Sequence, residues 1–142
     1  MYNYKVRARN LVKKYGTSNP FEIACYMNID ILRLKLPDTI RGFLVRVLRR
    51  KFIALNANLP YEAQKIVVCH ELGHAILHKG YGYYLHADMN YYVPSRREKE
   101  ANQFAIHLLS HSSDLDADLI TKVISEKDPN PREVHRILST LL

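Results

Sequence analysis

The apolar positions divide the chain into a helical start, a strand-rich middle and a mainly helical second half. Residues 3–15 carry sparse apolar positions at helical spacing and stop at Gly16, a residue typical of helix ends. Pro20 suits the first position of a shorter helix over residues 21–27. The chain is therefore predicted to begin with two helices.

Alternating apolar residues predict a small sheet in the middle of the chain. Residues 29–36 form one predicted strand, which Pro37 ends. Residues 42–48 and 52–55 flank a basic turn and are typical of a hairpin. The apolar positions of the second strand share one face: Phe43, Val45 and Val47. We expect a small, mainly antiparallel sheet that packs on the following helix.

The second half is predicted to be helical apart from a tyrosine-rich loop over residues 79–95. A long apolar helix includes Ile66 to His78 and starts near Pro60. Three further helices are predicted over residues 95–109, 112–125 and 131–142. The overall prediction is an α+β fold.

Length and composition indicate one globular domain over residues 1–142, since 47% of the residues are hydrophobic and no linker interrupts the chain. Cys25 and Cys69 do not make a disulfide framework, and Cys69 is expected to be a small core residue. We find no signal-peptide core and no apolar run of membrane-spanning length. The cytoplasm is therefore the expected compartment, with no membrane partner.

The formal net charge of +7 favours acidic partners, nucleic acid included. The basic residues are spread along the chain, which is more typical of a solvated surface than of a groove that binds nucleic acid. Direct nucleic-acid binding is therefore not expected. The sequence leaves the oligomeric state open.

The clearest chemical pattern is His70-Glu71-Leu72-Gly73-His74. Two histidines four apart on a helix project from one face, about 40° apart around the axis, so both can reach one metal ion. Glu71 falls about 100° from His70, beside the metal, where it can polarise a water molecule. This H-E-x-x-H pattern is typical of zinc peptidases.

The setting of the pattern supports a metal site, because its flanks are apolar and predict a buried helix. Two buried histidines and a carboxylate are costly without partners, and a metal ion is one such partner. The alternative is a core helix whose histidines make ordinary hydrogen bonds.

A catalytic zinc ion usually has three protein ligands, so a third is needed. Glu98 and Glu100 are the candidates on the next helix. Glu98 shares its helical face with apolar positions such as Ala101 and Ala105, whereas Glu100 lies about 200° away on the polar face. We therefore prefer Glu98 as the third ligand. Its alternative role is that of a carboxylate at the helix start, stabilised by the helix dipole.

Three other polar residues are weaker candidates. Asn102 can hydrogen-bond a metal-binding histidine or the backbone. His78 lies about 12 Å along the helix from His70, too far to share one ion, and is expected to be structural or to support a ligand. His86 is an alternative ligand.

The segment His70 to His78, with Glu98-Lys99-Glu100-Ala101-Asn102-Gln103-Phe104-Ala105 after it, resembles the ImmA/IrrE family of metallopeptidases. The resemblance covers roughly residues 5 to 110. It implies a zincin-like fold, Zn²⁺ held by His70, His74 and Glu98, and Glu71 as the catalytic base. Ser110-His111-Ser112 departs from the Met-Pro ending common in the family and leaves the local substrate groove in doubt.

The resemblance further implies an intracellular endopeptidase that cleaves a helix-turn-helix transcriptional repressor and so derepresses the genes that it silences, in a mobile element or a stress response. The alternative is a zincin-fold module that binds a repressor without cutting it, or cuts it only when activated. The oxyanion of the reaction needs a donor besides the metal, and Tyr91, Tyr92 or a loop histidine are candidates that the sequence does not separate. The sequence identifies neither the substrate nor the cleavage site.

Overall fold

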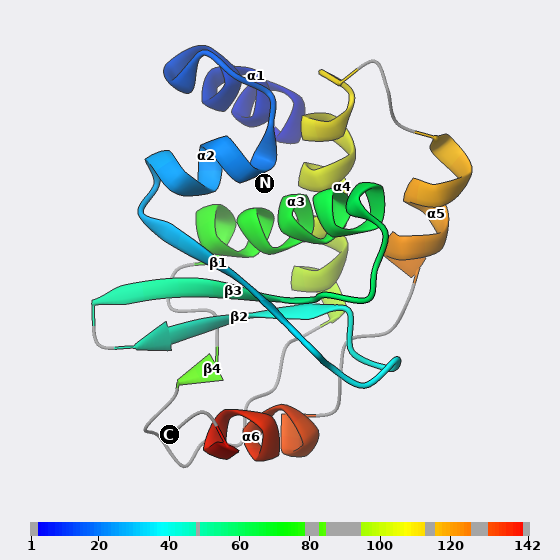
Figure 1. The fold of residues 1–142 in the computed structure, drawn as a ribbon. Helices are drawn as coiled ribbons and strands as arrows, with labels where there is room; N and C mark the ends of the chain where they lie inside the picture. The colour runs from blue at the N-terminus through cyan, green and yellow to red at the C-terminus, as the bar shows by residue number, and fades with distance from the viewer. Residues whose placement is uncertain are drawn as a thin grey trace.

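The computed structural model describes residues 3–47, 49–78, 83–84, 95–112, 116–125 and 131–140. Within these ranges the chain forms an α+β fold in which a small mixed sheet lies between helices (Figure 1). The helices are α1 (Tyr4–Tyr15), α2 (Pro20–Tyr26), α3 (Tyr61–Leu77), α4 (Ser95–Leu109), α5 (Ala117–Ser125) and α6 (Pro131–Thr140). The strands are β1 (Ile29–Leu34), β2 (Gly42–Val47), β3 (Arg50–Asn56) and β4 (Tyr83–Tyr84).

The first two helices form where the sequence predicts them, because both have local start and stop signals. The side-chain oxygen of Asn3 accepts a hydrogen bond of 3.1 Å from the backbone N–H of Val6 at the start of α1. Gly16 ends the helix in the left-handed conformation, with φ of 69°, and its N–H donates to the Val12 carbonyl. Pro20 is the first residue of α2.

The strands lie in the order β1-β3-β2-β4. The predicted hairpin is present, since β2 and β3 pair antiparallel, but β1 pairs parallel with β3 and β4 pairs parallel with β2. The expectation of a mainly antiparallel sheet is therefore wrong. The reason is that β3 is inserted between β1 and β2, which run in opposite directions but are not neighbours. The loop predicted over residues 79–95 is also wrong at Tyr83–Tyr84, which form β4.

Helices cover both faces of the sheet, with α3 on one side and α6 on the other (Figure 1). Leu44, Ile53 and Leu55 belong to the core cluster that includes α3, which confirms the predicted packing of the sheet on this helix. Phe43 and Val45 point the other way, into a second cluster with residues of α6. Successive side chains of β2 point to opposite faces of the sheet, so this strand contributes to both clusters.

The later helices differ from the prediction mainly at their ends. The helix expected over residues 112–125 begins only at Ala117, and α6 is described from Pro131 to Thr140. The helix expected over residues 95–109 is α4, and it has these bounds. No helix in the described ranges is both long enough and apolar enough to cross a membrane.

Helices α3 and α4 approach each other closely at a glycine. A Cβ atom added to Gly73 would lie 3.0 Å from the carbonyl oxygen of Ala101 and 3.1 Å from its Cα. Both distances are shorter than an ordinary van der Waals contact. The two small residues therefore allow the backbones to pack at short range, which sets the separation of the side chains on either side of this contact.

A second close contact holds the start of β2 against β3 and α3. A Cβ atom at Gly42 would lie 2.7 Å from the Ala54 carbonyl oxygen and 2.9 Å from Cγ1 of Val67. We predict that Gly42→Ala lowers the free energy of unfolding by about 1–3 kcal/mol, because the backbone must shift to admit the methyl group. Urea denaturation of both proteins measures this difference. An unchanged transition midpoint would contradict the packing described here.

Candidate metal centre

The motif of two histidines lies in the buried part of α3. The helix begins just after Pro60, and apolar side chains on most of its sides enter the core. His70, Glu71 and His74 are all buried, and His74 is completely inaccessible to solvent. Polar groups this deep need partners, as the sequence indicates.

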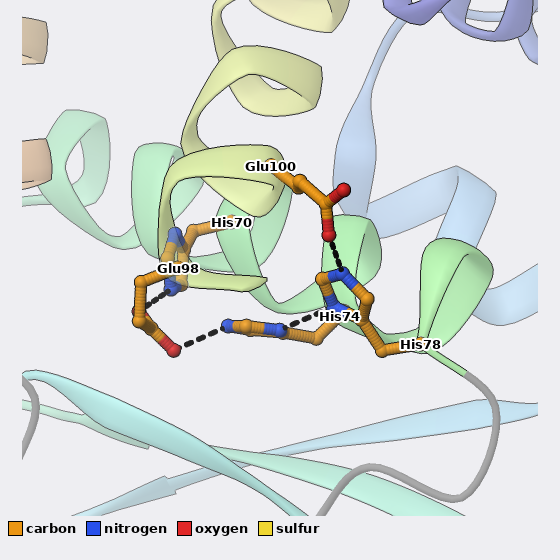
Figure 2. Close-up of polar contacts among 5 residues, drawn as sticks. All are labelled: His70, His74, His78, Glu98 and Glu100. Carbon is orange, nitrogen blue, oxygen red and sulfur yellow. Dashed lines mark hydrogen bonds and ion pairs between the residues drawn. The ribbon is translucent and has the colours of Figure 1, made fainter. Parts of the chain in front are cut away.

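Helix α4 supplies a carboxylate to both histidines. Glu98 Oε2 lies 3.1 Å from Nε2 of His70, and Glu98 Oε1 lies 2.8 Å from Nε2 of His74. Figure 2 shows the carboxylate facing both rings, with Glu98 coming from the first turn of α4. The side chain of Glu98 is 21% exposed, whereas its Oε1 atom is buried.

The surroundings act differently on the two histidines. Burial, together with the neighbouring rings of His70 and His78, lowers the pKa of His74 to about 4 against the opposing effect of Glu98. Burial disfavours the charged form of His70, but the hydrogen bond that the charged ring donates to Glu98 and the charges of Glu71 and Glu98 outweigh this effect and raise the pKa of His70. His74 is therefore neutral at neutral pH, the form in which a histidine binds metal.

The donor set fits a divalent cation. A tetrahedral zinc ion with bonds of about 2.0–2.1 Å separates neighbouring ligand atoms by roughly 3.3 Å. The two contacts between Glu98 and the histidine Nε2 atoms, 3.1 and 2.8 Å, lie close to this separation. Imidazole nitrogens and a carboxylate oxygen each offer a lone pair, which is the chemistry that zinc prefers.

Glu71 lies beside the same site. Its carboxylate lies within 4.8 Å of the ligand nitrogens of His70 and His74, and these three residues alone could form a metal-binding cluster. The contacts of Glu98 with both rings are shorter, however. Glu71 is thus placed next to the position where a cation would lie between the imidazoles and Glu98.

A further pair of residues, His78 and Glu100, also contacts this site. Nδ1 of His78 lies 2.9 Å from Nδ1 of His74, and Nε2 of His78 lies 2.8 Å from Oε1 of Glu100 (Figure 2). The sequence placed Glu100 on the polar face of its helix and did not predict its contact with His78, which leaves only 18% of the Glu100 side chain exposed. The four-residue spacing of His74 and His78 was the available signal for this contact.

The remaining candidates are less informative. Asn102 Oδ1 is buried and has no hydrogen-bond partner among the described residues. His86, Tyr91 and Tyr92 lie outside the described residues. Cys69 is buried, as predicted, and burial raises the pKa of its thiol.

Comparison with known proteins identifies relatives of this chain. Residues 24–132 match the family Peptidase_M78, described as the IrrE N-terminal-like domain. The chain is 39% identical over 105 residues to "Uncharacterized immunity region protein 2" of Bacillus phage phi105, an alignment that covers 74% of this chain and 66% of that protein. It is 30% identical over 107 residues to "Metallopeptidase ImmA" of Bacillus subtilis strain 168, with 74% of this chain and 62% of that protein covered.

The alignments thus span just under two thirds of the length of each relative. No solved structure matches the chain significantly. The family match covers most of the chain and includes all four residues of the site, His70, Glu71, His74 and Glu98. On this evidence the chain belongs to the ImmA/IrrE family of metallopeptidases.

Proposed function

We propose that this chain is a zinc-dependent endopeptidase with a zincin-like fold. The observation that carries the proposal is the convergence of His70, His74 and Glu98 from two helices, with Glu71 beside them. In this proposal His70, His74 and Glu98 are the metal ligands and Glu71 is the catalytic base. Three protein ligands leave one position for a water molecule, as in catalytic zinc sites.

Zinc is the cation favoured by the ligand types, since two imidazoles and a carboxylate are a common set in zinc hydrolases. Hard cations such as Mg²⁺ and Ca²⁺ prefer oxygen ligands throughout. A bound zinc ion lowers the pKa of a water molecule towards neutrality and polarises the carbonyl group of the scissile bond. The chain's own residues then move the protons.

Glu71 is proposed to accept a proton from the attacking water and to deliver it to the leaving amine. Its burial next to the two imidazoles fits this role, because a base must lie within reach of the water at the cation. His70 and His74 would hold the cation through their Nε2 atoms, and Glu98 would complete the ligand set from α4. The donor for the oxyanion is proposed to be Tyr91, Tyr92 or a loop histidine.

The proposed substrate is a helix-turn-helix transcriptional repressor, whose cleavage in the cytoplasm would relieve repression. Two findings support this class of substrate. The residues of both motifs resemble those of a family in which members cleave such repressors. In addition, a relative with 39% identity is named as an immunity region protein of a phage.

Removal of the carboxylate from α4 tests the metal site. We expect Glu98→Ala to lower the affinity for Zn²⁺ by more than the 10–100-fold that loss of a supporting residue outside the ligand set typically costs. Competition with a chromophoric chelator measures the affinity. Glu62→Ala is the matched control, because Glu62 is an exposed carboxylate in the first turn of α3. Equal zinc affinity in the Glu98 variant and the unmodified protein would remove Glu98 from the ligand set.

Replacement of the base separates binding from cleavage. We expect Glu71→Gln to retain zinc but to cleave a candidate repressor at least about 10²–10⁴ times more slowly, because the amide cannot accept the proton of water. The substrates to test are purified helix-turn-helix repressors, and the measurement is the appearance of fragments on a gel. A sample treated with a chelator is the control for the dependence of cleavage on metal.

The same assay tests the alternative of a non-cleaving module. Such a module would bind the repressor with zinc present and yield no fragments with either protein. Cleavage at the full rate by the Glu71→Gln variant would instead contradict the role proposed for Glu71.

A further inference from the structure

Each ring nitrogen of His74 is linked to a carboxylate of α4, one directly and the other through His78. On one side, Nε2 lies 2.8 Å from Oε1 of Glu98. On the other side, Nδ1 lies 2.9 Å from Nδ1 of His78, whose Nε2 lies 2.8 Å from Oε1 of Glu100. Figure 2 shows the His74 ring between Glu98 and His78, with Glu100 beyond His78. The proposed function assigns no role to His78 or Glu100.

The direction of the hydrogen bonds follows from the chemistry of the last residue in this chain of contacts. A carboxylate oxygen accepts hydrogen bonds and has no proton to donate. Nε2 of His78 must therefore carry the proton in its bond with Glu100. In a neutral imidazole the other nitrogen then has a lone pair, so Nδ1 of His78 accepts.

The bond between the two histidines is thereby fixed as well. Because Nδ1 of His78 accepts, Nδ1 of His74 must donate, and in the neutral ring its Nε2 has the lone pair. This lone pair points towards Glu98. A lone pair and a carboxylate oxygen 2.8 Å apart repel each other unless a proton or a metal ion lies between them, and in the metal-bound form both atoms are ligands.

We propose that Glu100 and His78 are positioning residues, which hold His74 in the tautomer that presents the Nε2 lone pair to zinc. The inference rests on the proposed metal site and deepens it by adding these two residues. His78 is 5% exposed, so its ring has little access to solvent as an alternative hydrogen-bond partner. Supporting hydrogen bonds of this kind orient a ligand and increase its basicity.

The experiment compares Glu100→Ala and Glu100→Gln with the unmodified chain. We expect Glu100→Ala to weaken Zn²⁺ binding about 10–100-fold, the usual cost of losing such a partner. Glu100→Gln should lose less, because its amide oxygen can still accept from Nε2 of His78. Chelator competition gives the affinities, and Glu62→Gln is the matched control, since it removes an exposed carboxylate of α3.

If Glu100 had a purely structural role, its replacement would lower the stability of the fold and would not specifically weaken zinc binding. Alanine has a higher helix propensity than glutamate, so Glu100→Ala does not weaken α4 through its backbone. Thermal unfolding followed by circular dichroism checks that the variants remain folded. Zinc affinities within twofold of the unmodified chain for both variants would overturn the proposal.

The tautomer of His78 provides a measurement that needs no variant and no activity assay. In the zinc-loaded protein, ¹⁵N NMR of the imidazoles should show His78 protonated at Nε2 and unprotonated at Nδ1. A proton at Nδ1 of His78 would overturn the positioning role while leaving the metal site intact. Failure of the unmodified chain to bind Zn²⁺ would instead reject the proposed function itself, so the two outcomes are distinguishable.

Discussion

The close packing of α3 against α4 is the constraint on which the candidate site depends. Gly73 has no side chain, and a Cβ atom there would approach the Ala101 carbonyl to 3.0 Å. Glu98 precedes Ala101 by about one helical turn, and Gly73 lies between His70 and His74. The contact between the two small residues therefore also sets the distance from the carboxylate to the imidazoles. The glycine of the motif has a packing role as well as a place in the pattern.

Burial explains why these side chains need one another. The interior disfavours an isolated carboxylate and a protonated imidazole alike, and it lowers the pKa of His74 to about 4. A neutral histidine can use its lone pair, but the lone pair then faces the oxygen of Glu98. A divalent cation resolves this conflict, since all the groups that converge on it are electron-pair donors. The family match and the geometry thus agree on a metal-dependent chemistry.

Local features of the sequence predicted most helices and strands, but they did not predict which distant strands pair with each other. The caps of α1 and the period of two along β2 act over a few residues and can be read directly. The insertion of β3 between β1 and β2 is decided by packing between distant segments, so the parallel pairs were missed. Helical phase placed Glu98 on the apolar stripe of α4 and Glu100 on its polar face, but it did not predict the contact between Glu100 and His78. Phase describes one helix alone, whereas the partner of Glu100 lies at the end of another helix.

Glu98 and Glu100 each constrain the rotation of α4 about its own axis, because each contacts a histidine of the facing helix or its end. Glu98 and Glu100 diverge by about 200° around the helix axis, yet one contacts His74 directly and the other contacts it through His78. A rotation of α4 that shortened one of these contacts would lengthen the other. Because each bond polarises the next in a buried chain of hydrogen bonds, loss of one weakens the rest. The first turn of α4 is therefore held where its two carboxylates face both sides of the His74 ring.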